Sequence, residues 1–306
     1  MGLAATNGDR VPARMHEPVM VAEVCELMLA HGPAPVVDVT VGAGGHADAM
    51  LAAGCPRVIG IDRDEAALAA AADRLAPYGD RVILRQANFS DMGIVLDELG
   101  IAAVGGILAD LGMSSLALDD PARGFSFRFD GPLDMRMDRS QTIRAYDLVN
   151  EETESDLSRI IFEYGEERHA RRIARYIVAA RRRHPLETTA ELSAVVTSAV
   201  GGRRGGHVHP ATRTFQALRI AVNREIESLA ALLEQAGARL VEHGRLITIA
   251  YHSLEDRPIK LRMRELVQSR GFSAVTGRLM RPGAAEVARN PRARSARLRC
   301  IERGAS

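Results

Sequence analysis

Glycine and acidic residues follow the first apolar segment of the chain at a spacing that could hold a nucleoside. Residues 36–39 form a short β-branched run, typical of a buried strand, and Gly42, Gly44 and Gly45 come directly after it. Glycines let backbone N–H groups approach a ligand closely, because no Cβ intervenes. A second apolar run ends in Asp62, which could accept hydrogen bonds from two ribose hydroxyls. The pattern predicts a cofactor that carries a nucleoside.

The order of the glycines favours one cofactor class over another. A dinucleotide fingerprint reads G-x-G-x-x-G, whereas here Gly44 and Gly45 are followed by His46 and no third glycine stands at the helix-packing position. S-adenosylmethionine is therefore favoured over a pyrophosphate-containing dinucleotide, and a dehydrogenase is the weakest functional class. Taken by itself, the loop could also be a purely structural turn.

Two further polar segments follow predicted strands. Asp110 ends a fourth apolar run, where it could orient an amine or the cofactor, or merely cap a turn. The segment 251–257 carries His252, Ser253, Glu255 and Asp256, more polar residues than a helix cap requires. A serine hydrolase is disfavoured because the chain has no G-x-S-x-G elbow.

The remaining candidates are an aromatic residue and a histidine pair. Phe89 follows the third strand, where its ring could stack on adenine or belong to the core. His207 and His209 lack a third partner in the sequence, so we expect no metal site.

These residues need a sheet to bring them together. Strands and helices alternate as far as Asp110, residues 111–148 read as an irregular loop, and helices dominate afterwards. We expect one long helix over 212–234, a strand over 244–251 and a final edge strand over 298–302. The predicted fold class is α/β, a Rossmann-like methyltransferase sheet with a helical domain inserted after strand four. Its expected parts are a disordered 1–14, a methyltransferase domain over 15–112 and 212–306, and an inserted loop and helical substrate-recognition domain over 113–211.

Composition indicates in which cellular compartment the protein works and which partners it could bind. The 306 residues are 46% hydrophobic and 26% charged, and no apolar run approaches a membrane span. Three widely spaced cysteines suggest a reducing cytoplasm. The net charge of +1 demands no nucleic acid. Arginine nevertheless gathers in 168–183, at Arg203 and Arg204, and in 290–299, which suggests contacts with phosphates, and the aromatic–arginine segment 125–129 strengthens that reading. A solvated charged face is the alternative for any one patch.

These motifs together resemble a known family. The chain is similar to the bacterial S-adenosylmethionine-dependent ribosomal RNA small subunit methyltransferase H family, also called MraW. The matching segments run in order through nearly the whole chain: HEPVMVAEV (16–24), DVTVGAGGH (38–46), GIDRDEAAL (60–68), NFS (88–90), DLGMSS (110–115), RGFSF (123–127), GPLDMRMD (131–138), YGEERHARRIARYIV (164–178), HPATRTFQALRIAVNREIE (209–227), YHSLEDR (251–257) and NPRARSARLR (290–299).

The resemblance implies methylation of N4 of a decoding-centre cytosine in 16S rRNA, with the assembled small subunit as substrate. It implies cofactor contacts from Gly44, Gly45, His46, Asp62, Phe89 and Asp110. Members commonly carry Gln where this chain has Ala117, so that side-chain contact is missing, and Phe where this chain has Tyr251.

The chemistry expected from these residues is transfer to a weakly nucleophilic amine. We expect the catalytic set to be Asp110, His252, Ser253, Glu255 and Asp256, with Asp134, Arg136, Arg292 and Arg294 binding the substrate. A non-catalytic assembly factor, or a methyltransferase for DNA or protein, remains an alternative, although the absence of a Pro-Pro-aromatic motif counts against DNA. Oligomeric state stays open, a homodimer included.

Overall fold

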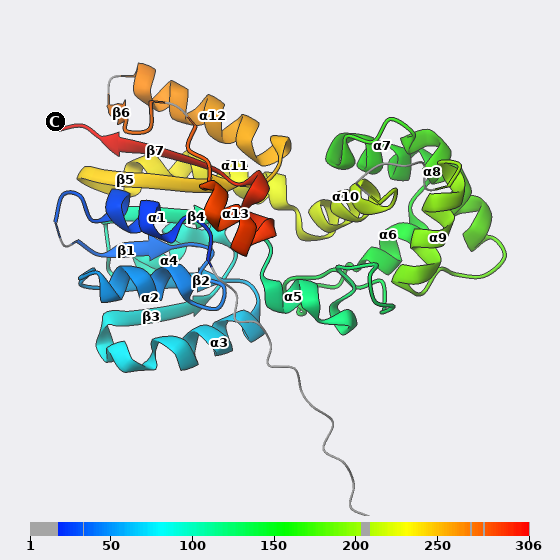
Figure 1. The fold of residues 1–306 in the computed structure, drawn as a ribbon, viewed down its shortest axis with the longest axis horizontal. Coiled ribbons are helices and arrows are strands. Elements are labelled where there is room, and N and C mark those ends of the chain that lie inside the picture. The colour runs from blue at the N-terminus through cyan, green and yellow to red at the C-terminus, as the bar shows by residue number, and fades with distance from the viewer. Residues whose placement is uncertain (1–17, 33, 203–208, 270, 278, 306) are drawn as a thin grey trace, which may run out of the picture.

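The computed structural model in Figure 1 describes residues 18–32, 34–202, 209–269, 271–277 and 279–305. The expectations for residues 1–14, Arg203, Arg204 and His207 lie outside these ranges. Within them, none of the helices combines the length and the apolar composition that a membrane span needs.

A seven-stranded sheet is the centre of the fold, in the order β3-β2-β1-β4-β5-β7-β6. The strands are β1 (Val36–Asp38), β2 (Val58–Asp62), β3 (Val82–Gln86), β4 (Val104–Asp110), β5 (Leu240–Ala250), β6 (Phe272–Ala274) and β7 (Arg297–Arg303). Strands β1 to β5 pair in parallel, and β7 is antiparallel to both of its neighbours. The strand order reverses between β1 and β4, so the ligand crevice is expected outside the carboxyl ends of those two strands.

Helices cover both faces of this sheet (Figure 1). The first face carries α1 (Val21–Met28), α2 (Gly45–Ala52) and α3 (Glu65–Leu75), and the second carries α4 (Met92–Glu98), α11 (Glu225–Ala236) and α12 (Ser253–Gln268). Two separate apolar clusters result, one on each side. Strands buried on both faces explain why the β1 and β2 sequences are nearly uninterrupted apolar runs. The expected α/β class is confirmed.

A helical layer is inserted between β4 and β5 (Figure 1). It contains α5 (Ser115–Asp119), α6 (Ala145–Glu151), α7 (Glu154–Gly165), α8 (Ala170–Arg181), α9 (Thr189–Ala199) and α10 (Thr212–Asn223). These helices enclose an apolar cluster of their own. That cluster includes Phe215, Leu218 and Val222 of α10, so α10 packs with the inserted helices although its sequence lies beyond residue 211.

The prediction of a single helix over 212–234 is wrong, because the helix is interrupted at Arg224. Arg224 adopts a left-handed conformation (φ 49°) between α10 and α11. Asn223 holds the break: its side chain donates to Met135 O and accepts from Met137 N, while its carbonyl accepts from Arg63. The break thus joins the inserted layer to the loop after β2.

The C-terminal region also differs from expectation. The final strand is not at the edge, because β7 lies between β5 and the short β6. The segment read as an irregular loop contains α5 and most of α6, and 272–297 contains β6 and α13 (Ala284–Arg289). Short 3₁₀ turns complete the described elements: η1 (Ala76–Arg81), η2 (Phe89–Asp91), η3 (Pro121–Arg123), η4 (Gly237–Arg239) and η5 (Pro291–Ser295).

Candidate active site

A pocket of about 360 Å³ opens at the carboxyl ends of β1 and β4. Two sets of residues line it. The first set, which we call the cofactor wall, comprises Gly42, His46, Asp62, Phe89 and Asp110. The second set, which we call the polar cluster, comprises Arg219, Glu225, His252 and Glu255. The pocket therefore joins residues of the sheet to residues beside the α10–α11 break.

The glycine turn after β1 shapes the cofactor wall. Gly44 adopts φ 80° as the N-terminal cap of α2 and packs against Leu75, so it stands behind the pocket rather than in its lining. Gly45 lines the pocket, and a Cβ there would lie 2.9 Å from Cγ of Pro18. Both positions thus need glycine, but only Gly45 faces the cavity.

Asp62 ends β2 and lies in the pocket lining, as the sequence predicted. Its carboxylate accepts backbone N–H groups from Gly42 (2.9 Å) and Asp64 (2.9 Å), which fixes its orientation beside the glycine turn. Burial raises its pKa, and these two hydrogen bonds oppose the rise.

Phe89 lies in η2 directly after β3 and also lines the pocket. The guanidinium of Arg63 lies over its ring, 5.4 Å from the centroid. Arg63 is itself buried and donates to Asn223 O. The ring is therefore held between the end of β3 and the helix break.

Asp110 lies at the end of β4, facing both sets of side chains. The hydroxyl of Tyr251 donates to Asp110 Oδ1 (2.9 Å), and Nδ1 of His46 lies 3.8 Å from Oδ2. The backbone N–H of Asp110 donates to Thr40 Oγ1 (2.7 Å). Burial and the neighbouring Asp110 raise the pKa of Tyr251, so its phenol remains a donor.

Asp38 lies behind the pocket at the end of β1 and was not among the predicted site residues. It is 1% exposed and accepts from the backbone N–H of Thr40, and its Oδ2 has no hydrogen-bond partner among the residues that the structure describes. Burial raises its pKa to about 7. A buried carboxyl oxygen without a partner is costly, unless the group is protonated or a cation approaches it.

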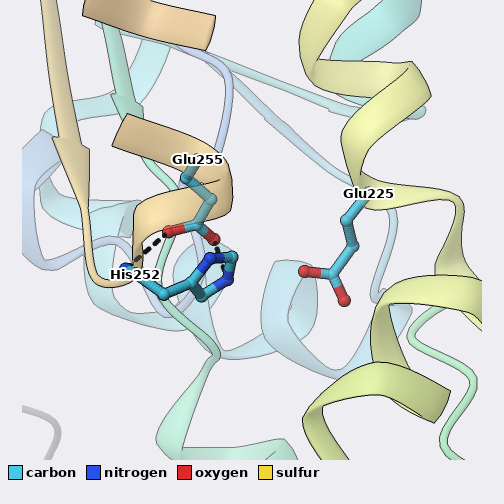
Figure 2. A group of neighbouring side chains, drawn as sticks. All are labelled: Glu225, His252 and Glu255. Carbon is cyan, nitrogen blue, oxygen red and sulfur yellow. Dashed lines mark hydrogen bonds and ion pairs between the residues drawn. The ribbon is translucent and has the colours of Figure 1, made fainter. Parts of the chain in front are cut away.

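The polar cluster is built from two element junctions (Figure 2). His252 and Glu255 come from the β5–α12 junction, and Glu225 is the first residue of α11. Their side chains point toward one another, and one ligand-type atom from each lies within 4.8 Å of the others. Glu255 is 3% exposed; its carboxylate accepts the N–H of Tyr251 (2.8 Å) and lies 3.0 Å from His252 Nε2.

Arg219 supplies the positive charge of this cluster. Its guanidinium donates to both oxygens of Glu225, each at 2.9 Å, and lies 3.5 Å from His252 Nε2. Burial lowers the pKa of Arg219, but Glu225 and Glu255 raise it more, so the net shift is upward. Two carboxylates and a histidine could bind a metal ion, yet here a guanidinium already compensates Glu225.

Ser253 and Asp256 point to neighbours outside the pocket lining. Ser253 donates to Glu166 (2.7 Å), and Asp256 pairs with Arg299 (2.8 Å) and Arg297 (3.4 Å). Burial raises the pKa of Asp256, and the two arginines lower it more, so the net shift is downward. The structure thus brings His252 and Glu255 to the pocket and directs their two neighbours to the helical layer and β7.

The predicted substrate-binding residues are dispersed. Asp134 and Arg136 bind each other through two hydrogen bonds (2.8 and 2.9 Å) and do not line the pocket. Arg292 does line it and pairs with Asp119 (2.7 Å), whereas Arg294 is exposed.

Two of the remaining sequence features also have definite places. Ala117 is 1% exposed and lines the pocket. His209 stacks on Phe127 with ring centroids 4.5 Å apart, and its Nδ1 accepts the N–H of Ala211.

Comparison with known proteins decides the family. The model of the MraW methylase family matches residues 13–304. The chain belongs to the MraW methylase family. It is 48% identical to the ribosomal RNA small subunit methyltransferase H of Geotalea uraniireducens, across 94% of this chain and 98% of that protein. It is 46% identical to the protein of the same name from Cutibacterium acnes, across 99% of this chain and 95% of that protein.

A solved structure, a putative rRNA-methylase from Clostridium thermocellum, is 13% identical with a TM-score of 0.47, covering 94% of this chain and 98% of that one. As a member of the MraW methylase family, the chain is a methyltransferase whose cofactor is S-adenosylmethionine, as the glycine order and Asp62 predicted. A non-catalytic role is not favoured.

The residues of the pocket fit this cofactor. Three carboxylates, Asp38, Asp62 and Asp110, stand at or behind the cofactor wall, and none forms an ion pair with a lysine or arginine within the described part of the chain. S-adenosylmethionine carries a sulfonium, an ammonium and a ribose diol. A cationic ligand with hydroxyl donors would compensate these acids, which no lysine or arginine of the described residues pairs with.

Sequence reasoning missed Arg219 and Glu225. Both lie inside the segment HPATRTFQALRIAVNREIE, but a continuous helix places them on its surface. Only the break at Arg224 turns Glu225 toward β5, and no periodicity in the segment signals it. Thr40 was missed because a threonine after a strand reads as part of the turn.

Proposed function

We propose that this methyltransferase transfers the methyl group of S-adenosylmethionine to N4 of a decoding-centre cytosine in 16S rRNA, within the small ribosomal subunit of the cytoplasm. The observation that carries the proposal is that the cofactor wall and the polar cluster face one cavity, and that Tyr251 links them, because its hydroxyl donates to Asp110 and its backbone N–H donates to Glu255. The relatives named ribosomal RNA small subunit methyltransferase H support the choice of substrate.

The polar cluster suits a cytosine. The exocyclic amine of cytosine donates hydrogen bonds, which carboxylates accept, and the carbonyl oxygen O2 and ring nitrogen N3 of the base accept from a guanidinium. Glu225, Glu255 and Arg219 offer both kinds of group at one place. The base must leave its stack to enter a pocket of this depth, as other base-modifying enzymes require.

Proton transfer is the step that the protein must arrange. When bound, S-adenosylmethionine supplies an already activated methyl group. As N4 gains this methyl group it must lose one proton, and a carboxylate that accepts an N–H of the amine can receive it. We assign this role to Asp110, held by Tyr251, with Glu255 and His252 orienting the base. We assign Ser253 and Asp256 to holding the start of α12.

Recognition of the RNA outside the pocket is assigned to the inserted residues 113–211 and to the segment around Arg292 and Arg294. Asp134 and Arg136 form one closed pair in that insert, so we propose that they shape the substrate-facing loop rather than contact the base.

The test uses labelled S-adenosylmethionine with small subunits from cells lacking the gene, and naked 16S rRNA in parallel. Digestion to nucleosides should place the label in N4-methylcytidine from subunits, and Asp110→Ala should leave it out. Cofactor binding with no label in RNA would refute the proposal in favour of an assembly factor, and label in another nucleoside would refute the cytosine assignment.

A further inference from the structure

Helix α8 presents an unusual concentration of positive charge. Exposed arginines stand along one side of the helix and its two ends, with Tyr176 among them. We call this set the α8 arginine face; its members are Arg168, Arg171, Arg172, Arg175, Arg182 and Arg183. No acidic residue occurs within α8 itself.

These arginines are not used to hold the fold together. Within the described residues, no ion pair or hydrogen bond involves any side chain of the α8 arginine face; its one contact places Arg172 over the ring of Tyr176, 5.8 Å from the centroid. Elsewhere, arginines of similar exposure pair with acids, as Arg144 does with Asp147 and Arg292 with Asp119. Other exposed arginines, such as Arg57, Arg85 and Arg264, also form no ion pair within the described residues, so what distinguishes the α8 arginine face is the gathering of six such side chains along one helix and its two ends.

The opposite side of the helix supplies its stability. Ala170, Ile173, Ala174, Ile177 and Val178 are buried in the apolar cluster of the helical layer. Like charges one turn apart, as at Arg171 and Arg175, oppose helix formation rather than support it. The charge therefore has a cost for the isolated protein, which a bound anion would remove.

The location of the face separates it from the pocket. Helix α8 lies in the part of the helical layer farthest from the sheet in Figure 1, and none of its residues lines the pocket. A ligand on this face would extend well beyond the reacting base.

We propose that the α8 arginine face binds the phosphate backbone of ribosomal RNA at a place remote from the methylated base. The inference rests on the proposed function for its RNA partner, and it names the surface that docks the substrate. Guanidinium groups suit phosphates because their donors form a fork that matches two oxygens. Tyr176 offers an exposed ring beside them, on which an unpaired base could stack.

An anionic membrane is the other polyanion that could attract this face. Membrane-surface helices insert an apolar side between lipid chains. The apolar side of α8 is already buried in the protein core, so only its charged side is available. The geometry favours RNA.

The experiment compares two matched triple variants for binding to purified small subunits across a salt titration. One is Arg171→Gln/Arg172→Gln/Arg175→Gln. The control is Arg57→Gln/Arg85→Gln/Arg264→Gln, which removes three exposed arginines of the sheet region that form no ion pair in the described residues. Both carry the same net charge change, so a general charge effect is shared.

We expect the α8 variant to bind subunits at least tenfold more weakly, and the control less than threefold. Each lost phosphate contact should lower the slope of log K against log salt by about 0.7 to 0.9, so the α8 slope should fall by about two to three. Replacing the same three arginines with lysine should restore most of the slope, because the charge remains. Cofactor affinity within twofold of the wild type will report an intact fold.

Equal slopes for the two Gln variants would overturn the proposal, as would failure of the lysine variant to recover binding. Loss of binding to phosphatidylglycerol vesicles with unchanged subunit binding would assign the face to membranes instead. Binding is measured without methyl transfer, so a wild type that binds subunits but does not methylate them would refute the proposed function and leave this inference standing.

Discussion

The two walls of the pocket treat negative charge in opposite ways. In the cofactor wall and behind it, Asp38, Asp62 and Asp110 accept from backbone N–H groups and a phenol, and no guanidinium in the described part of the chain pairs with them. In the polar cluster, Glu225 is bound by both arms of Arg219. The cofactor wall, which we also call the first wall, suits a ligand that carries positive charge. The polar cluster, the second wall, suits a neutral base that it binds through hydrogen bonds. A cationic ligand is thus expected beside the carboxylates that have no cationic partner, and a neutral ligand beside the carboxylate that Arg219 already pairs with.

The largest loss of activity should come from a substitution of Asp110, which belongs to the cofactor wall and lines the same pocket as the polar cluster. Asp110→Ala should lower kcat for subunit methylation by about a thousandfold, because it removes the assigned proton acceptor. Single-turnover methylation with calorimetric measurement of cofactor binding separates chemistry from affinity. If cofactor still binds and methylation is within tenfold of the wild type, Asp110 does not receive the proton.

The charge compensation of the second wall predicts a stability effect. Arg219→Met should lower the free energy of unfolding by about 3 kcal/mol, because removing one partner leaves a buried carboxylate unpaired. Urea unfolding provides the measurement, and Arg219→Met/Glu225→Gln is the matched control. The double variant should recover part of the loss, whereas simple addition of the two single effects would show that the pair is not coupled.

Because Asp38 lies buried behind the cofactor wall, we expect the free energy of unfolding to depend on pH. The pKa of Asp38 is about 7 in the folded protein and ordinary in the unfolded chain, so between those values the folded state holds one more proton. The free energy of unfolding should therefore fall as pH rises toward 7, by about 3 kcal/mol between pH 5 and pH 8 without cofactor. Urea unfolding of wild type and Asp38→Asn at both values isolates the contribution of this group.

The free energy of unfolding of Asp38→Asn should not fall between pH 5 and pH 8, whereas that of the control variant Asp97→Asn should fall as in the wild type. Asp97 is exposed and pairs with Arg239, which lowers its pKa, so it stays ionised over this range. A fall of equal size in Asp38→Asn would mean that another group is responsible.

The smallest effect should come from the hydroxyl of Tyr251, a residue that contacts Asp110 of the cofactor wall through this hydroxyl and Glu255 of the polar cluster through its N–H. Tyr251→Phe removes the hydrogen bond to Asp110 and retains the ring, so kcat should fall only about threefold. Comparing kcat with cofactor affinity gives the sharper readout, since a residue that positions Asp110 should lower kcat and leave cofactor affinity within twofold of the wild type. An unchanged kcat would remove Tyr251 from a positioning role.

Sequence reasoning located the first wall better than the second, for a physical reason. The glycine turn, His46 and Asp62 follow strand ends, and parallel strands bring their carboxyl ends to one edge whatever the rest of the chain does. The second wall depends on a helix break at Arg224 and on α10 packing with α7, which are tertiary features. Local periodicity reads α10 and α11 as one helix because both halves have the same apolar spacing.

The arginine-rich segments show the same limit. In sequence, 168–183 and 290–299 look equivalent as basic stretches. In the structure, Arg297 and Arg299 bind Asp256, whereas no ion pair within the described residues involves an arginine of the α8 arginine face. Composition shows where charge is, but only tertiary contacts show whether it is neutralised.

The pairing of β7 with β5 also affects how the protein acquires activity during synthesis. Strand β5 leads directly to His252 and Glu255, and its outer edge is paired only by residues 297–302. While a ribosome is still translating those codons, this edge is open and Asp256 lacks Arg297 and Arg299. The β5–α12 junction, and with it His252 and Glu255 of the polar cluster, is therefore fixed in place only after residues 297–302 have paired with β5.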